Sequence, residues 1–279
     1  MTSTAETVEV DFITPRHLAG GGDPAWITVP LHRASGWSHG DDPLMPRVLL
    51  SSPDQKALLR LEPDPEGQWW TLQHAAEPGR PAWYASFGAR TPVELIAAVT
   101  DALTDPGPPE GEAADPFEPL RQVAWSAPAV GADDLVSPDD TAYVQRLGSA
   151  EEPGAWFVTA TLGPNRPVWQ ARFDAHTPPH LVTAFTSALA DPNPVYRTTG
   201  ARGLPTLNPR LVTRRYIDVP AVYVAAALER AFPRCPAQRH AGGPAPRVAG
   251  PGSPARPQPL TPIPARKYLA LATLLEQQH

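Results

Sequence analysis

Apolar and polar side chains alternate in four short segments in the first third of the chain, and each segment predicts a β-strand. The segments are 48–50, 57–61, 68–74 and 82–87. The first two flank a Ser-Pro-Asp turn, in which Pro53 suits the second turn position, so they predict a hairpin. The last two are rich in aromatic residues and are bounded by glycine and proline. Period-two alternation places three side chains of the last segment on one face of the sheet: Trp83, Ala85 and Phe87.

A helix is predicted directly after these strands. Thr91 and Pro92 supply an N-cap and a first helical residue, and Glu94 completes a capping box. Apolar residues then recur at four-residue spacing and form one stripe: Leu95, Val99 and Leu103. An Asp-Pro pair at 105–106 ends the predicted helix.

The same pattern of strands and helix occurs a second time at an offset of 86 residues. The matches include Trp70 with Trp156, Trp83 with Trp169, Phe87 with Phe173, and Thr91-Pro92 with Thr177-Pro178. The second helix has its own apolar stripe at Leu181, Phe185 and Leu189, although His180 replaces Glu94. Self-similarity at a fixed period indicates an internal repeat.

We therefore predict an α+β fold of two tandem repeats, each a three- to four-stranded antiparallel sheet packed on one C-terminal helix, then a largely disordered basic tail. The predicted boundaries are 8–106 for the first repeat, 107–116 for a Pro/Gly/Glu linker, 117–192 for the second repeat and 193–265 for the basic tail. That tail includes a short helix near 222–232, and a terminal helix follows at 266–279. The two units can pack sheet on sheet or edge on edge.

These residues resemble a known family. The Ser-Pro-Asp turn before an apolar strand, the Trp-Tyr-Ala-Ser-Phe strand and the TPVELIAAVTDAL helix are similar to the SPDY-motif domain family of unknown function. The resemblance covers residues 8–192 and implies a tandem-domain protein of an actinomycete bacterium. Gln55 and Asp140 stand where the motif has tyrosine. The family implies no reaction, cofactor or catalytic residue.

The charges are distributed unevenly along the chain. Residues 1–195 contain 11 Lys and Arg against 26 Asp and Glu, a balance of −15, whereas residues 196–279 contain 12 against 3, a balance of +9. A basic tail of this kind often meets nucleic acid or another polyanion. The alternative is that the tail lies against its own acidic body.

Catalytic and metal-binding patterns are weak, so we predict no enzyme activity, no cofactor and no metal site. The three glycines at 20–22 lack the neighbours of a phosphate-binding loop, and no Gly-x-Ser-x-Gly motif occurs. His176 and His180 have the spacing of helical zinc ligands, but two prolines lie between them. The first repeat has Arg90 and Glu94 at the corresponding positions.

The other candidates for chemistry are a loop and a single thiol. His32, His39, Asp41 and Asp42 form a polar cluster of residues that commonly build turns. Cys235 stands alone, so no internal disulfide can form, and a cytoplasmic location is expected. No stretch of 18 apolar residues occurs, so we predict no membrane span.

Strand residues that alternate away from the predicted core carry the remaining signal. They are Trp69, Gln73, Tyr84, Phe157, Gln170 and Arg172. Such a surface can stack bases or contact a partner. It can also be the buried seam between the two repeats, and this is the interpretation that we favour, because exposed Trp and Phe normally need covering.

Two functions follow from these features. The first is a non-catalytic binding or scaffold protein whose paired repeats present a sheet surface to a macromolecular partner. The second is a nucleic-acid-binding protein, in which a surface similar to those of PUR-repeat and Whirly proteins acts together with the arginines of the tail: Arg197, Arg202, Arg210, Arg214 and Arg215. The sequence leaves the choice between a protein partner and DNA open, and it leaves a homodimer open as well.

Overall fold

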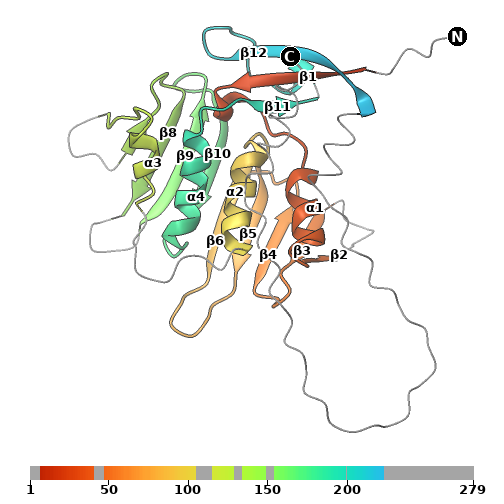
Figure 1. The fold of residues 1–279 in the computed structure, drawn as a ribbon. Helices are drawn as coiled ribbons and strands as arrows, with labels where there is room; N and C mark the ends of the chain where they lie inside the picture. The colour runs from red at the N-terminus through yellow and green to blue at the C-terminus, as the bar shows by residue number, and fades with distance from the viewer. Residues whose placement is uncertain are drawn as a thin grey trace, which may run out of the picture.

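The two repeats join into one antiparallel sheet of nine strands (Figure 1). The computed structural model describes residues 7–40, 47–104, 115–128, 134–148, 154–198 and 200–222, without the side chains of residues 201 and 202. The strands of the large sheet follow the order β2-β3-β4-β5-β6-β10-β9-β8-β7. The α+β fold with tandem repeats is therefore confirmed.

The first repeat has the predicted four strands and helix. These are β3 (Val48–Ser51), β4 (Ala57–Leu61), β5 (Gln68–His74), β6 (Trp83–Gly88) and α2 (Val93–Thr104). The second repeat reproduces them as β7 (Asp134–Val136), β8 (Ala142–Leu147), β9 (Ala155–Thr161), β10 (Pro167–Phe173) and α4 (Pro179–Ala190). The two helices have the same length, which shows that the repeat is structural as well as sequential.

Each repeat begins earlier than its strands. Helix α1 (Ala25–Arg33), which precedes β2 (Ser38–Gly40), and the short helix α3 (Glu118–Arg121) were not predicted. Trp37 and Trp125 follow them, are buried, and donate backbone N–H bonds to the carbonyls of Leu31 and Leu120, respectively. The matching tryptophans thus anchor an extra helix at the start of each repeat.

The Ser-Pro-Asp turns close two equivalent hairpins. In the first, the Ser52 hydroxyl donates to Asp54 and accepts from the backbone N–H of Ala57. Gln55 adopts φ +61°, in the left-handed region that an ordinary residue seldom occupies. Ser137 and Asp139 repeat these bonds in the second turn, where Asp140 has φ +56°. The two side-chain hydrogen bonds hold each turn in this conformation.

Strands β6 and β10 form the seam between the repeats. Their register pairs Ser86 with Arg172, and the flanking pairs are Ala85 with Phe173 and Phe87 with Ala171. Exchanging the two repeats maps this register onto itself, because Ser86 and Arg172 occupy the same position in their repeats. A pseudo-twofold axis therefore passes through the Ser86–Arg172 pair, as in an isologous dimer.

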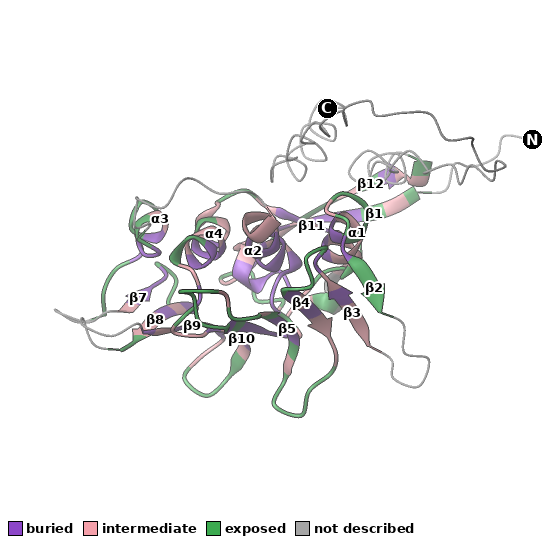
Figure 2. Cartoon of the chain, turned by 90° about the horizontal axis from the view of Figure 1, so that it is seen from below, coloured by how far each residue is buried: buried purple, intermediate pink, exposed green. Residues whose placement is uncertain are grey.

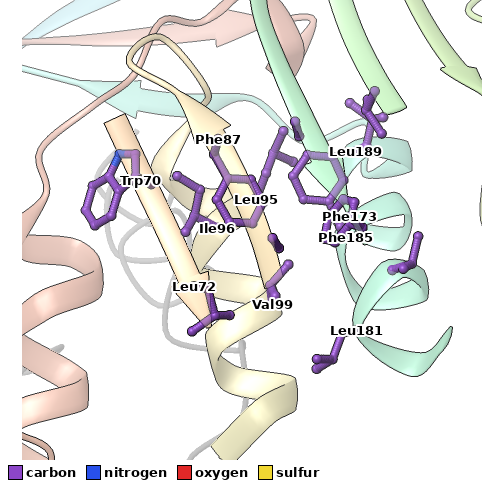
Figure 3. Close-up of a cluster of buried hydrophobic side chains, with 14 of the residues drawn as sticks. Trp70, Leu72, Phe87, Leu95, Ile96, Val99, Phe173, Leu181, Phe185 and Leu189 are labelled. Carbon is purple, nitrogen blue, oxygen red and sulfur yellow. The ribbon is translucent and has the colours of Figure 1, made fainter. Parts of the chain in front are cut away.

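The core lies where the seam meets the two long helices (Figure 3). Phe87 and Phe173 face each other across the seam with ring centroids 5.6 Å apart, and both pack on Phe185 of α4. All three side chains are fully buried. Edge-to-face and stacked contacts of this kind add to the hydrophobic gain of burying the rings.

All four helices cover the same face of the large sheet (Figures 1 and 2). They lie in the order α1, α2, α4, α3, because α1 packs on α2, α2 on α4 and α4 on α3. This order follows the pseudo-twofold axis. Within the described ranges, no helix has the length and apolar character needed to cross a membrane.

A second sheet of three strands lies at one end of the large sheet. Strand β1 (Thr7–Thr14) runs between β11 (Val195–Arg197) and β12 (Thr213–Pro220). Strand β1, which the predicted first repeat includes from residue 8, lies outside the large sheet, and β11, η2 (Gly200–Gly203) and β12 lie within the predicted basic tail. The 3-10 helices η1 (Arg16–Leu18) and η2 complete this end.

The remaining predictions for the tail and the linker lie outside the described residues. They concern most of the linker at 107–116, the terminal helix at 266–279 and all but the first residue of the helix at 222–232.

The predicted capping box at the start of α2 is wrong. Glu94 binds the guanidinium of Arg197, with Nη1–Oε1 and Nη2–Oε2 distances of 2.6 and 3.0 Å. The Thr91 hydroxyl is buried and has no hydrogen bond among the described residues. An ion pair with a distant strand has replaced the local cap.

Truncation of a seam phenylalanine tests the shared core. Phe87→Ala is expected to lower the free energy of unfolding by about 3–5 kcal/mol, and Phe173→Ala by a similar amount, because each ring packs in the same cluster. Urea unfolding should show a single transition for both repeats in each variant. Leu147→Ala, at a side chain that is 57% exposed, should change stability by less than about 0.5 kcal/mol. Two separate transitions would show that the repeats are independent.

Candidate functional site

The face of the large sheet opposite the helices, here called the open face, has no covering element among the described residues (Figure 2). Along each strand the side chains alternate between the helices and this face. Antiparallel sheets tolerate such exposure when the outward residues are polar. The open face carries hydroxyl, amide and guanidinium groups together with several aromatic rings.

One row of outward side chains crosses almost the whole sheet. Strand pairing aligns Leu49, Arg60, Thr71, Ser86, Arg172, Phe157, Gln145 and Asp134. Only Phe157 and Arg172 of this row are among the residues predicted as a surface. Period-two alternation could have predicted the remaining outward residues of the row. Arg60, for example, stands between inward Leu59 and Leu61 in the same strand.

The predicted aromatic residues lie on the open face and not in a seam between packed sheets. Tyr84 is 49% exposed, and Trp69 is 40% exposed. Trp69 accepts a backbone hydrogen bond from Glu62, which places it beside the ion-pair partner of Arg60. Phe157 is half-buried. The preferred interpretation of these positions as a buried seam was wrong because the repeats join edge to edge.

Polar side chains hold Arg172 in place at the centre of this face. Its Nε donates to Gln170 Oε1 at 2.9 Å, and Gln170 Nε2 donates to Thr159 Oγ1 at 3.2 Å. Arg172 and Gln170 are both half-buried, whereas the predicted surface residue Gln73 is exposed. These hydrogen bonds orient the guanidinium on the open face.

The two repeats agree on the inward face of the sheet and differ on the open face. Six of ten inward strand pairs are identical, the full set being Leu50/Leu135, Ala57/Ala142, Leu59/Val144, Leu61/Arg146, Trp70/Trp156, Leu72/Val158, His74/Ala160, Trp83/Trp169, Ala85/Ala171 and Phe87/Phe173. None of the nine outward strand pairs is identical: Leu49/Asp134, Ser51/Val136, Leu58/Tyr143, Arg60/Gln145, Trp69/Ala155, Thr71/Phe157, Gln73/Thr159, Tyr84/Gln170 and Ser86/Arg172. The open face is thus asymmetric on a symmetric scaffold.

Two arginines of the set predicted to bind nucleic acid form ion pairs within the fold. Arg197 is buried, binds Glu94, and donates to the carbonyls of Ala19 and Gly20. Arg214 pairs with the buried Asp11 at 2.5 Å and also with Glu9. Part of the basic tail therefore pairs with acidic residues of the body. This agrees with the alternative interpretation of the uneven charges, in which the tail lies against its own acidic body.

The other arginines of the predicted set lie apart from the open face. Arg210 is exposed in the connection to β12, and Arg215 is exposed on β12 itself. Both therefore belong to the small-sheet end of the molecule. The backbone of Arg202 lies in η2, and its side chain is not described. The structure does not gather the five tail arginines beside the aromatic residues.

A second polar cluster joins η1 to the Ser-Pro-Asp turn of the second repeat. The Nε2 of buried His17 lies 2.7 Å from Thr141 Oγ1 and 3.6 Å from Asp139 Oδ2. Burial acts to raise the pKa of Asp139, but His17 and hydrogen bonds from Ser137 and Thr141 hold that pKa well below its ordinary value. Trp169 Nε1 donates to the His17 carbonyl, so the cluster docks the chain start on the sheet.

The histidines proposed as weak metal candidates do not assemble into a site. Burial, followed by the charge of Arg80, lowers the pKa of His180. The Nδ1 of His32 lies 2.9 Å from the Trp37 carbonyl, His39 is exposed, and residues 41–42 are not described. Within the described parts of the chain no three His, Cys, Asp or Glu side chains are placed to hold a metal ion. Cys235 lies outside them.

Two tandem repeats of four strands and a helix, fused into one sheet, define this class of protein. Residues 51–109 and 136–195 both match the model of a family described as SPDY: domain of unknown function (DUF317). The chain therefore contains two regions that match this domain family, in agreement with the tandem-domain resemblance. No curated protein and no solved structure matches it.

The Asp139 cluster predicts a difference between the two turns at low pH. Because its folded-state pKa is lowered, Asp139 stabilises the fold above its unfolded pKa of about 3.9, and this contribution is lost as pH falls toward the folded value. Asp139→Asn should therefore reduce the loss of stability between pH 7 and pH 3, measured by urea unfolding. The equivalent change in the exposed first turn, Asp54→Asn, should have a smaller effect. An unaltered pH dependence in Asp139→Asn would contradict this assignment.

Proposed function

We propose that the chain is a non-catalytic binding protein whose open face docks a protein partner. The observation that carries this proposal is the exposure of Trp69 and Tyr84 on a sheet whose other face is packed under helices. Trp, Tyr and Arg supply most of the binding energy in protein interfaces. Arg172 lies at the centre of the sheet, opposite Ser86, which stands two residues from Tyr84 on β6.

The size of the open face supports a protein-sized partner. The nine strands of the large sheet contain 48 residues, which at roughly 3.4 Å per residue and about 4.8 Å between strands give a face of about 780 Å². A standard interface buries about 800 Å² on each partner. One docked protein can therefore cover the open face.

The charges favour protein over nucleic acid. Residues 1–195, which contain the whole large sheet, carry a balance of −15. The central row offers only Arg60 and Arg172, and Arg60 already lies 3.6 Å from Glu62. Single-strand binders track the phosphate backbone with a positively charged groove, whereas this face combines two arginines with hydroxyls, amides and rings.

Photo-cross-linking tests the proposed partner surface. The full chain carrying benzoylphenylalanine at position 84, expressed in its native host, should form one dominant protein adduct. The same probe at position 123, an exposed site beside α3, should not form it. The purified adduct protein should bind the wild-type chain, and Trp69→Ala with Tyr84→Ala should weaken that binding at least about tenfold.

Two results would overturn the proposal. One is the same adduct from positions 84 and 123, or binding that the double variant leaves unchanged. The other is tight, salt-dependent binding of a labelled single-stranded oligonucleotide that the double variant weakens. The second result would assign the open face to nucleic acid instead.

A further inference from the structure

We infer that the open face binds one partner molecule per chain, across the seam of β6 and β10, and that this partner presents a carboxylate to Arg172. This inference rests on the proposed function, because it specifies the chemistry of the molecule that occupies the same face. It follows from three features of Arg172: its position, its hydrogen bonds and the absence of a match in the first repeat.

Arg172 lies at the geometric centre of the open face. It pairs with Ser86 across the seam and with Phe157 on the other side. Tyr84 belongs to the neighbouring outward row of β6. Binding energy concentrates near the centre of an interface, where the surrounding contacts exclude water. A partner that covers the aromatic residues of both repeats therefore has to cover Arg172.

The Arg172 guanidinium lacks an internal counter-ion. Among the described residues no carboxylate lies within ion-pair distance of it, whereas Arg197 pairs with Glu94 and Arg214 with Asp11. Its Nε is bound to Gln170, which leaves the two terminal nitrogens for another group. Two parallel N–H donors match a carboxylate, and such charge-assisted pairs are stronger than neutral hydrogen bonds.

The charge of the body selects a protein carboxylate over a chain of phosphates. A polyphosphate meets the field of residues 1–195, whose balance is −15, along its whole length. A single Asp or Glu in an otherwise apolar or polar partner brings only one negative charge into this field, and that charge can pair with Arg172. The neighbouring rings of Tyr84 and Phe157 supply contact area for the residues on both sides of that carboxylate.

The asymmetry of the open face limits binding to one partner. A pseudo-twofold axis creates two equivalent sites only where both repeats carry the same residues. Ser86 is the counterpart of Arg172, Gln170 of Tyr84, and Phe157 of Thr71. The arginine therefore occurs once, with the exposed aromatic rings of Trp69 and Tyr84 on one side of it. This arrangement fixes the orientation of the partner as well as the number bound.

A random library of 12-residue peptides, displayed and selected on the immobilised full chain, provides the probe. Selected peptides should share an Asp or Glu and bind one per chain in calorimetric titration. Arg172→Gln should weaken binding roughly ten- to hundredfold, the range for a hydrogen-bonded charge pair. Replacing the acidic residue of the peptide by its amide should cost the same on the wild type and almost nothing on Arg172→Gln.

Two further variants complete the test. Arg60→Gln removes the other arginine of the central row, which already pairs with Glu62, and should change affinity less than about threefold. Gln170→Glu keeps Arg172 but gives it an internal carboxylate, so it should weaken the same peptides even if Arg172→Gln does not fold.

The outcomes separate the two proposals. Peptides that require Trp69 and Tyr84 but tolerate both Arg172→Gln and Gln170→Glu, or that bind two per chain, would overturn the carboxylate inference and leave the proposed function standing. No binders, or peptides indifferent to all of these positions, would remove both proposals.

Discussion

The hydrogen-bonded pairing of β6 with β10 makes one sheet from two repeats, and the other features of the molecule depend on its register. A slip of one residue would turn every outward side chain of β10 toward the helices. The observed register brings Phe87 and Phe173 together over Phe185, and it sets α2 beside α4. A single buried layer then serves both repeats, because neither repeat has to cover its own sheet edge at the seam.

The same edge-to-edge joining leaves the open face without a cover. Sheet-on-sheet packing would have buried the outward residues, whereas a continuous sheet buries one face only. The third strand of each repeat, β5 or β9, lies inside the large sheet. The free edges of that sheet are the short strands β2 and β7. Short edges protect the sheet from pairing with other chains, which agrees with placing the proposed partner on the open face.

Local signals were sufficient for the repeats and insufficient for what surrounds them. The Ser-Pro-Asp turns, the aromatic strands and the Thr-Pro helix starts all depend on neighbours in sequence, and each was predictable. Strand β1 pairs with β12 across about 200 intervening residues, and Glu94 finds Arg197 at a separation of 103. Neither partner leaves a local pattern. Pro30 inside α1 also hides that helix, since proline ordinarily ends one.

Alternation in the strands indicated which side chains face away from the core. Whether those side chains are covered depends on how the two repeats join, edge to edge or sheet on sheet. The internal comparison of the repeats then separates fold from function within one chain. Inward positions such as Trp70 and Trp156 stayed alike because both copies solve the same packing problem. Outward positions such as Ser86 and Arg172 are free of that constraint. Their divergence means that the open face is not needed in two copies, and a symmetric scaffold with one central arginine is suited to one asymmetric partner.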